Sequence, residues 1–210
     1  MLRLSRKARA RAADSQAAPM EPRPIILVSG LPRSGTSMMM QALSAGGVPV
    51  LTDSERTADQ DNPRGYLEFE RVKATEYDKS WLAQAQGKAV KMISALLRHL
   101  PPEYEYEIIF MRRELAEVLA SQQVMLRRRG AQSQGDDAKL AGLFETHLAH
   151  TASWLAQQPN MHVLYVDYHA VLAAPHTELA QVREFLRQEL NLNAMVAAID
   201  PSLHRQHPGR

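Results

Sequence analysis

The sequence predicts an α/β fold with a P-loop-like, three-layer architecture, in which helices flank a central, mostly parallel sheet. Short continuous apolar runs alternate with helical stretches along the 210 residues, an order typical of parallel sheets. The runs lack polar alternation, as strands buried on both faces do. A glycine-bearing turn separates the first run from the first helix. With 45% hydrophobic and 23% charged residues, the composition suits one globular domain.

The first half of the chain supplies two predicted strands. Residues 24–29 form an apolar run that Gly30 ends, and a helix is expected over 35–45. Residues 46–66 are rich in Gly, Pro, Asp and Asn and predict mainly a loop. A helix over 67–85, a strand over 88–93 and a helical turn over 96–100, stopped by Pro101 and Pro102, complete this half.

The second half supplies two further strands and longer helices. A buried-type strand over 107–111 precedes a helix over 114–128, whose apolar residues recur on one face. Residues 129–136 are polar and contain glycine, which predicts a loop. A long helix over 137–156, a strand over 163–166 and a helix over 177–190 follow.

Residues 1–23 form a basic tail ahead of the predicted domain, 24–210. The first 20 residues carry five basic side chains and one acidic one, whereas the remainder carries a formal charge of −2 within a total of +2. We expect a solvated extension; a transit peptide or a weak electrostatic contact is the alternative. The body's charge predicts no nucleic-acid partner. Since no secretory signal is visible, we expect a cytoplasmic protein without a membrane span.

The absence of cysteine excludes several classes of site. No residue of the 210 is Cys, so a disulfide framework, a thiolate zinc site, an iron–sulfur cluster and a cysteine nucleophile are ruled out.

A phosphate-binding loop follows the first predicted strand. Residues 30–37 read GLPRSGTS and lead into a helix, whose N-terminus and backbone N–H groups favour an anion. Gly30 and Gly35 have the offset of a nucleotide-binding P-loop, but Thr36 stands where that motif has lysine. Arg33 supplies the positive charge instead. An arginine fork with backbone amides suits a phosphosulfate, which is less charged than a triphosphate, and we expect no metal.

The segment IILVSGLPRSGTS resembles the 5′-phosphosulfate loop of sulfotransferases that use 3′-phosphoadenosine 5′-phosphosulfate (PAPS). Its PRSGTS core is especially similar to tyrosylprotein sulfotransferases and related bacterial enzymes. The resemblance implies that the phosphosulfate is bound by Arg33, Ser34, Gly35, Thr36 and Ser37.

The family's second signature is an arginine at a strand end with a serine eight residues later, both on the nucleotide's 3′-phosphate. Arg113 and Ser121 have this spacing, and Arg112 does not. The alternative is an exposed arginine pair and a helix serine bonded to its own backbone. Tyr165 resembles a tyrosine that lies near the adenine in the family, although a core tyrosine is an equal alternative.

Two family features are missing. The catalytic histidine of the cytosolic sulfotransferases has no counterpart in residues 90–94, and their glycine-rich C-terminal phosphate loop is absent. Both losses indicate a branch other than the one acting on small phenols and steroids.

The candidate catalytic residues are chosen by what sulfuryl transfer requires, namely cations for the developing charge and a base for the acceptor's proton. Cations must stabilise charge on the transferring group and the leaving oxygen, and Arg33 and Lys91 are the candidates; a surface strand lysine is the alternative for Lys91. A carboxylate must take the acceptor's proton. Asp53 and Glu55 straddle the position implied by the tyrosylprotein enzymes. Glu68 and Glu70 are the reserves.

We therefore expect transfer of a sulfuryl group from PAPS to a hydroxyl, or as a lesser alternative an amine, of a small-molecule or peptide acceptor. PAP, 3′-phosphoadenosine 5′-phosphate, would be the product. A divergent ATP-dependent kinase and a non-catalytic nucleotide-binding protein are the alternatives. The acceptor and the oligomeric state are not readable from the sequence.

Overall fold

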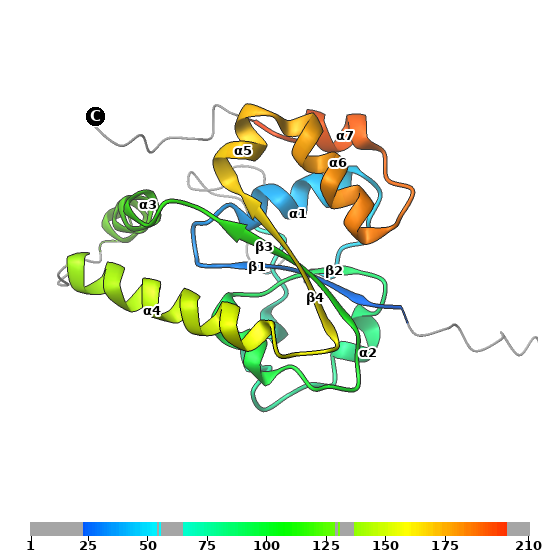
Figure 1. Ribbon diagram of the computed structural model, residues 1–210, viewed down its shortest axis with the longest axis horizontal. Helices are drawn as coiled ribbons and strands as arrows, with labels where there is room; N and C mark the ends of the chain where they lie inside the picture. The colour runs from blue at the N-terminus through cyan, green and yellow to red at the C-terminus, as the bar shows by residue number, and fades with distance from the viewer. Residues whose placement is uncertain (1–22, 54, 56–64, 129, 131–136, 201–210) are drawn as a thin grey trace, which may run out of the picture.

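A four-stranded parallel sheet forms the centre of the computed structural model, which describes residues 23–53, 55, 65–128, 130 and 137–200. Along the sheet the strands run in the order β2 (Ala89–Lys91), β1 (Ile25–Gly30), β3 (Tyr106–Arg112) and β4 (Met161–Asp167) (Figure 1). All three pairings are parallel. The prediction of an α/β fold with a parallel sheet is confirmed.

β1 is an inner strand, and this position explains its continuous apolar sequence. All six of its residues are buried. Side chains alternate between the two faces of a strand, so Ile26 and Val28 join one hydrophobic cluster while Ile25 and Leu27 join the other. Both faces of β1 therefore require apolar residues.

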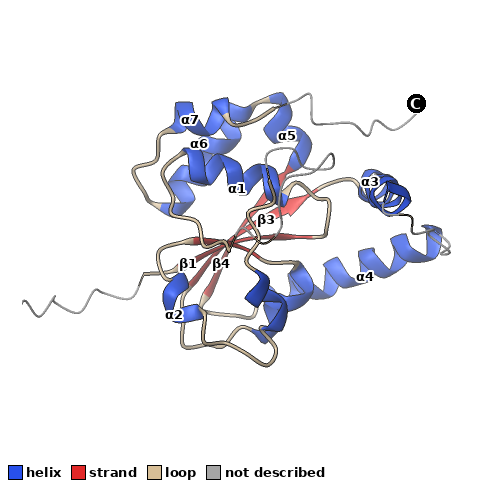
Figure 2. Ribbon diagram, turned by 180° about the vertical axis from the view of Figure 1, so that it is seen from behind, coloured by secondary structure: helices blue, strands red, loops and turns tan. Residues whose placement is uncertain are grey.

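Helices cover both faces of the sheet (Figures 1 and 2). One layer packs on Ile26 and Val28; it contains α1 (Thr36–Ala45), α6 (Pro175–Leu186) and α7 (Leu192–Ala197), with α5 (Tyr168–Ala173) beside them. The other layer packs on Ile25 and Leu27; it contains α2 (Leu82–Ala85), the 3₁₀ helix η2 (Ser94–His99) and the end of α4 (Asp137–Leu155).

The strand register brings three strand ends to one edge. Gly30 pairs with Met111, and Val28 pairs with Lys91. The loop after β1 therefore lies beside the ends of β2 and β3, where α3 (Leu115–Arg128) begins. In parallel α/β sheets this carboxyl edge is where ligands bind.

The helix predicted over 67–85 is largely wrong. The segment contains the 3₁₀ helix η1 (Glu70–Ala74) and the single turn of α2. Leu67 has a left-handed backbone, φ 48°, and Phe69 is extended, φ −124° and ψ 110°. These conformations exclude the start of the predicted helix, and the turn and irregular residues 75–81 separate η1 from α2.

The C-terminal helices differ from the prediction in number and length. The helix expected over 177–190 begins at Pro175 and ends at Leu186, because Arg187 adopts a left-handed conformation with φ 50°. Two short helices were not predicted. Asp167 caps α5 by accepting from the Ala170 amide, and Asn191 caps α7 by accepting from the Ala194 amide.

Two sequence predictions fall largely outside the described residues. Of the basic tail, 1–23, the structure describes Arg23, and of the loop at 129–136 it describes Gly130. Among the described helices, none combines the length and apolar character needed to cross a membrane.

Candidate active site

The loop between β1 and α1 is a tight turn that requires two glycines. Gly30 has φ 143°, and a Cβ there would lie 2.6 Å from the Ser34 Oγ and 2.7 Å from the Met111 carbonyl oxygen. Gly35 has φ 101°, and its Cβ would lie 2.5 Å from the ring of Tyr168. The Ser34 hydroxyl closes the turn by donating to the Leu31 carbonyl at 2.7 Å.

The N-terminus of α1 opens toward this loop. Gly35 is the N-cap residue, and no side chain caps the helix. The first N–H groups of a helix have no intrahelical acceptor, and the helix dipole places partial positive charge there. The loop thus has the geometry of an anion-binding turn, with Thr36 and Ser37 as the first helical residues.

Arg33 connects this loop to α3. Its backbone is left-handed, φ 71°, and its Nε donates to the Ser121 Oγ at 2.9 Å. Ser121 is buried in the second turn of α3. Two residues predicted to hold different parts of one nucleotide are therefore in direct contact.

The two arginines at the end of β3 point in different directions. Arg113 is 7% exposed and donates from Nη1 to the Arg33 carbonyl at 3.1 Å. Arg112 is exposed and lies over the ring of Tyr165, 3.8 Å from its centroid. Arg113, the residue that the family spacing selects, is thus the one that contacts the phosphate loop.

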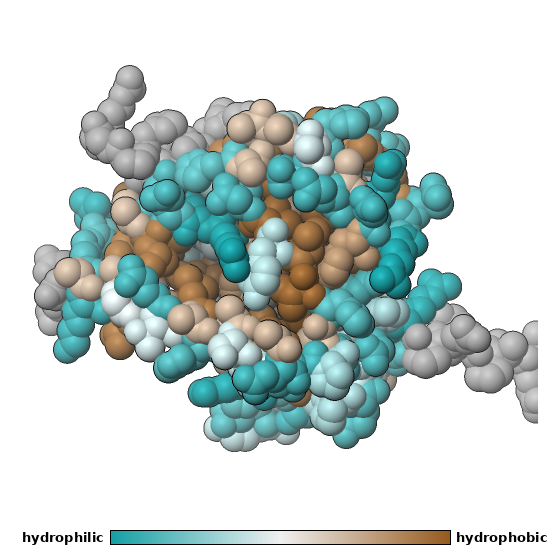
Figure 3. All heavy atoms as spheres, in the orientation of Figure 1, coloured by the Kyte–Doolittle hydropathy of each residue, from teal (hydrophilic) through white to brown (hydrophobic). Residues whose placement is uncertain are grey.

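A cavity of about 350 Å³ opens beside this arginine pair. It lies between the loop, the end of β3, α3 and α4, and it is lined by Leu31, Phe110, Arg112, Val118, Leu148 and Tyr165, among others. Hydrophobic surface gathers in the hollow beside α3 and α4 in Figure 3. Tyr165 is 37% exposed and packs 5.5 Å from the ring of Phe110, so it is a wall residue rather than a core residue.

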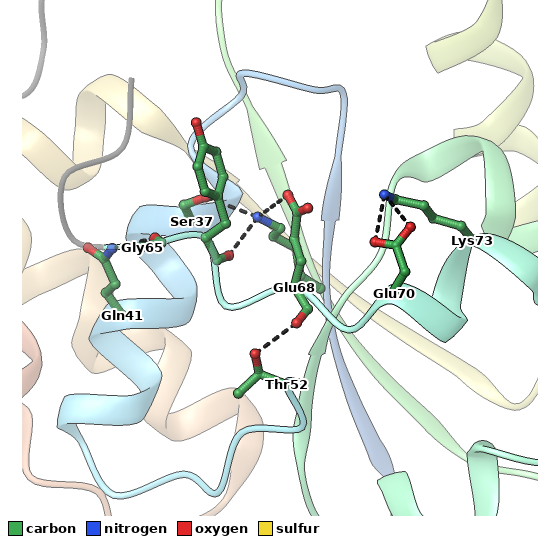
Figure 4. A network of polar contacts seen from close by, with 9 residues as sticks. Ser37, Gln41, Thr52, Gly65, Glu68, Glu70 and Lys73 are labelled. Atoms are coloured by element: carbon green, nitrogen blue, oxygen red, sulfur yellow. Dashed lines mark hydrogen bonds and ion pairs between the residues drawn. The ribbon is translucent and has the colours of Figure 1, made fainter. Parts of the chain in front are cut away.

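Lys91 lies on the opposite side of the loop, at the end of β2. Its Nζ donates to the Tyr66 carbonyl at 2.7 Å and to the Ser37 Oγ at 3.1 Å. The Glu68 carboxylate is 3.0 Å away, and both charged side chains are largely buried. Ser37 and Glu68 approach this amino group from α1 and from the segment before η1 (Figure 4).

The predicted carboxylate bases lie away from Lys91: Asp53 binds backbone amides and Glu55 is exposed. Asp53 accepts from the backbone amides of Glu70 at 2.5 Å and Glu55 at 3.1 Å. Burial tends to raise the pKa of Asp53, but these amide hydrogen bonds outweigh it, and the pKa falls below its ordinary value. Glu55 is exposed. In the described residues, neither carboxylate contacts Lys91 or the phosphate loop.

The two reserve glutamates, Glu68 and Glu70, face different partners. Glu68 faces Lys91, whereas Glu70 is paired with Lys73 at 2.7 Å on the surface of η1 (Figure 4). Of the four predicted carboxylates, Glu68 is the one that the described residues place beside Lys91 and thus near Ser37.

Glu117 and Tyr168 complete the site and were not predicted. Glu117 accepts from the Arg113 Nε at 2.8 Å, and Tyr168 lies under the Arg113 guanidinium at 4.3 Å. The four-residue spacing between Arg113 and Glu117 was visible in the sequence, but a glutamate in a helix is usually exposed. No sequence signal indicated Tyr168, which reaches the site from α5. Across the described parts of the chain, no group of three or more His, Asp or Glu could hold a metal ion.

Comparisons with known proteins give one matching family model and several similar structures. The family model described as "Sulfotransferase domain" matches residues 23–202. The sulfotransferase domain of the Synechococcus PCC 7002 olefin synthase has a similar structure, with a TM-score of 0.54 and 14% identity over 90% of each chain. A sulfotransferase from Alicyclobacillus acidocaldarius has a TM-score of 0.50 and 14% identity over 86% of this chain and 88% of its own.

The two structural likenesses establish the fold alone at these identities. Among curated protein sequences, none matches this chain. The family model covers nearly the whole described domain, and on that ground the chain belongs to the sulfotransferase domain family.

Proposed function

We propose that this protein transfers a sulfuryl group from PAPS to a hydroxyl of a small-molecule or peptide acceptor. The observation that carries the proposal is the convergence of Arg33, Arg113 and Ser121 beside the open N-terminus of α1. Two cations and a row of amide donors at one edge of the sheet suit a ligand with two separate phosphate groups.

PAPS would lie along the carboxyl edge of the sheet. Its phosphosulfate would meet Arg33 and the amides from Ser34 to Ser37, and its 3′-phosphate would meet Arg113 and Ser121. The adenine would lie against Tyr165, where the adjoining cavity offers an apolar wall. An aromatic ring and the Arg112 guanidinium stacked on it suit a planar base.

Sulfuryl transfer is an in-line displacement at sulfur. The acceptor oxygen forms a bond to sulfur, the bond from sulfur to the bridging oxygen breaks, and PAP leaves with the electron pair. Arg33 and Lys91 would stabilise the charge that develops on the transferring group and the leaving oxygen. The acceptor's proton passes to a carboxylate.

Glu68 is the best-placed carboxylate for this proton. It lies 3.0 Å from the Lys91 Nζ, which in turn lies 3.1 Å from the Ser37 Oγ. Asp53 is less suited because two backbone amides already bind its carboxylate, whereas Glu68 faces the amino group that contacts Ser37. We therefore place the base at Glu68 in preference to Asp53 or Glu55.

The test is thermal stability with PAP, with AMP and with ATP·Mg²⁺. A ligand at about 100 times its dissociation constant stabilises the native state by about 2.7 kcal/mol. We expect PAP to raise the melting temperature more than AMP at equal concentration, because AMP lacks the 3′-phosphate. Radiolabelled PAPS with an acceptor panel then measures transfer. Stabilisation by ATP·Mg²⁺ alone would contradict the proposal and favour a kinase.

A further inference from the structure

Glu117 is a buried carboxylate that the reaction scheme does not use. It lies in the first turn of α3 with 3% of its side chain exposed. One carboxylate oxygen accepts from the Arg113 Nε at 2.8 Å, and the other lies 3.1 Å from the His169 Nε2. Burying a carboxylate is costly unless it is paired and hydrogen-bonded, so the fold maintains Glu117 in a defined geometry.

Arg113 is held from three directions. Glu117 binds its Nε, the ring of Tyr168 lies 4.3 Å from the guanidinium carbon, and its Nη1 donates to the Arg33 carbonyl. A guanidinium is planar and carries five N–H donors in a fixed fork. Once the Nε edge is bound to Glu117 and one face is covered, the direction of the Nη donors is set.

The contact with Arg33 extends this arrangement to the phosphate loop. Arg33 has a left-handed backbone, φ 71°, a conformation that a non-glycine residue adopts at an energetic cost. The hydrogen bond from Arg113 to its carbonyl supports that conformation. The side chain of Arg33 then donates to Ser121, one helical turn beyond Glu117.

We propose that Glu117 is a positioning residue for the nucleotide: its carboxylate orients Arg113 so that one guanidinium both supports the loop at Arg33 and binds the nucleotide's 3′-phosphate. This inference rests on the proposed function. Glu117 itself touches neither the nucleotide nor the acceptor; it acts through Arg113. Loss of the carboxylate therefore weakens the binding of nucleotides that carry a 3′-phosphate more than the binding of those that lack it.

The experiment measures dissociation constants of PAP and AMP by calorimetry for wild type, Glu117→Gln and Glu117→Asp. Because hydrogen bonds to charged groups are stronger than neutral ones, we expect Glu117→Gln to raise the dissociation constant of PAP by about tenfold or more. The AMP constant should change much less, so the PAP-to-AMP ratio of dissociation constants, which is below one in wild type, rises toward one. Glu184→Gln, an exposed glutamate on α6, is the matched control and should keep the wild-type ratio.

Glu117→Asp keeps the buried charge and withdraws it by one methylene. It provides the same readout if Glu117→Gln fails to fold, and we expect an intermediate PAP-to-AMP ratio. A merely structural role would change both constants alike and leave the ratio unaltered, which would overturn the inference. If wild type itself does not prefer PAP to AMP, the proposed function fails and the inference fails with it. A wild-type preference that persists in both variants overturns the inference alone.

Discussion

Arg33 and Ser121 are joined by a hydrogen bond of 2.9 Å although 88 positions separate them in the chain. One belongs to the loop after β1 and the other to α3, and the register of β1 with β3 brings the two segments together. The contact brings the two sequence motifs together in the structure, as the proposed nucleotide site requires. Changes at either residue are therefore expected to affect the same ligand.

Replacing Arg33 with alanine should abolish sulfuryl transfer. The change removes the loop's cation and the hydrogen bond to Ser121, and loss of a single charge-stabilising donor typically lowers kcat by about 10²–10³-fold. Turnover of radiolabelled PAPS measures the effect, with the exposed Arg183→Ala on α6 as the control. Near-normal turnover in the Arg33 variant would contradict the assignment of Arg33 to the phosphosulfate site.

Ser121→Ala should weaken nucleotide binding more than it slows the chemical step. Its hydroxyl lies at the predicted 3′-phosphate site, away from the reacting sulfur, and a hydrogen bond contributes about 0.5–1.5 kcal/mol, equivalent to roughly 2- to 12-fold in affinity. We expect a higher dissociation constant for PAP and a higher KM for PAPS. A variant with unchanged PAP affinity and a large fall in kcat would move Ser121 to the chemical step.

Glu68→Gln and Asp53→Asn distinguish the two candidate bases. We expect Glu68→Gln to reduce kcat by about 10²-fold or more, the usual contribution of a general base, and to reduce it more than Asp53→Asn does. Asp53 binds the amides of Glu55 and Glu70, so its variant should show mainly lower stability. Steady-state kinetics and denaturant unfolding measure both effects, and the reverse order of kcat losses assigns the base to Asp53.

Gly35→Ala should destabilise the domain. Its φ of 101° disfavours any side chain, and a Cβ would lie 2.5 Å from Tyr168, so we expect a loss of about 1–3 kcal/mol in the free energy of unfolding. Gly142 in α4 has open space around its Cβ position. Gly142→Ala should therefore stabilise the protein by about 0.5–1 kcal/mol. Equal effects of the two changes in denaturant titrations would contradict the described loop.

The stability of the domain should fall on mild acidification because of His147. This α4 residue shares a 2.8 Å hydrogen bond with the Ser94 hydroxyl, and burial, followed by the charges of Arg98 and His150, lowers its pKa. Between that lowered pKa and its unfolded value of about 6.5, the unfolded chain binds more protons, so stability rises with pH. Acidification through that window should lower the melting temperature.

His147→Gln is the variant that tests this assignment. It should flatten the pH dependence of the melting temperature, while the exposed His150→Gln should leave it largely intact. If His147→Gln retains the wild-type slope, His147 does not account for the pH dependence.

The fold class and the position of the candidate site were predictable from local sequence. Apolar runs predicted all four strands; burial on both faces explains the runs of β1 and β3, whereas β4 is an edge strand with exposed residues. Arg113 and Ser121 were identified through the resemblance to the family's second signature, an arginine at a strand end with a serine eight residues later. The helix over 67–85 was mispredicted because helical composition reveals neither the left-handed backbone of Leu67 nor the turns that separate η1 from α2.

Residues whose role depends on tertiary contacts were not predictable in the same way. Glu68 is paired with Lys91, whereas Glu70 is paired with Lys73, and the sequence does not distinguish these two partners. The resemblance to the tyrosylprotein enzymes favoured Asp53 and Glu55, and it could not reveal that Asp53 accepts from the backbone amides of Glu55 and Glu70. Glu117 resembles any helical glutamate until the fold buries it against Arg113.

The central place of β1 has a consequence for biosynthesis. Ile26 pairs with Ala89 and Ile25 with Tyr106, so both neighbours of this strand are synthesised about 60 and 80 residues after it. During translation this largely apolar six-residue strand emerges with both backbone edges open, and unpaired strand edges are prone to aggregation. The element that carries the phosphate loop is thus made well before the two strands that flank it, and its second edge stays open until β3 has been synthesised.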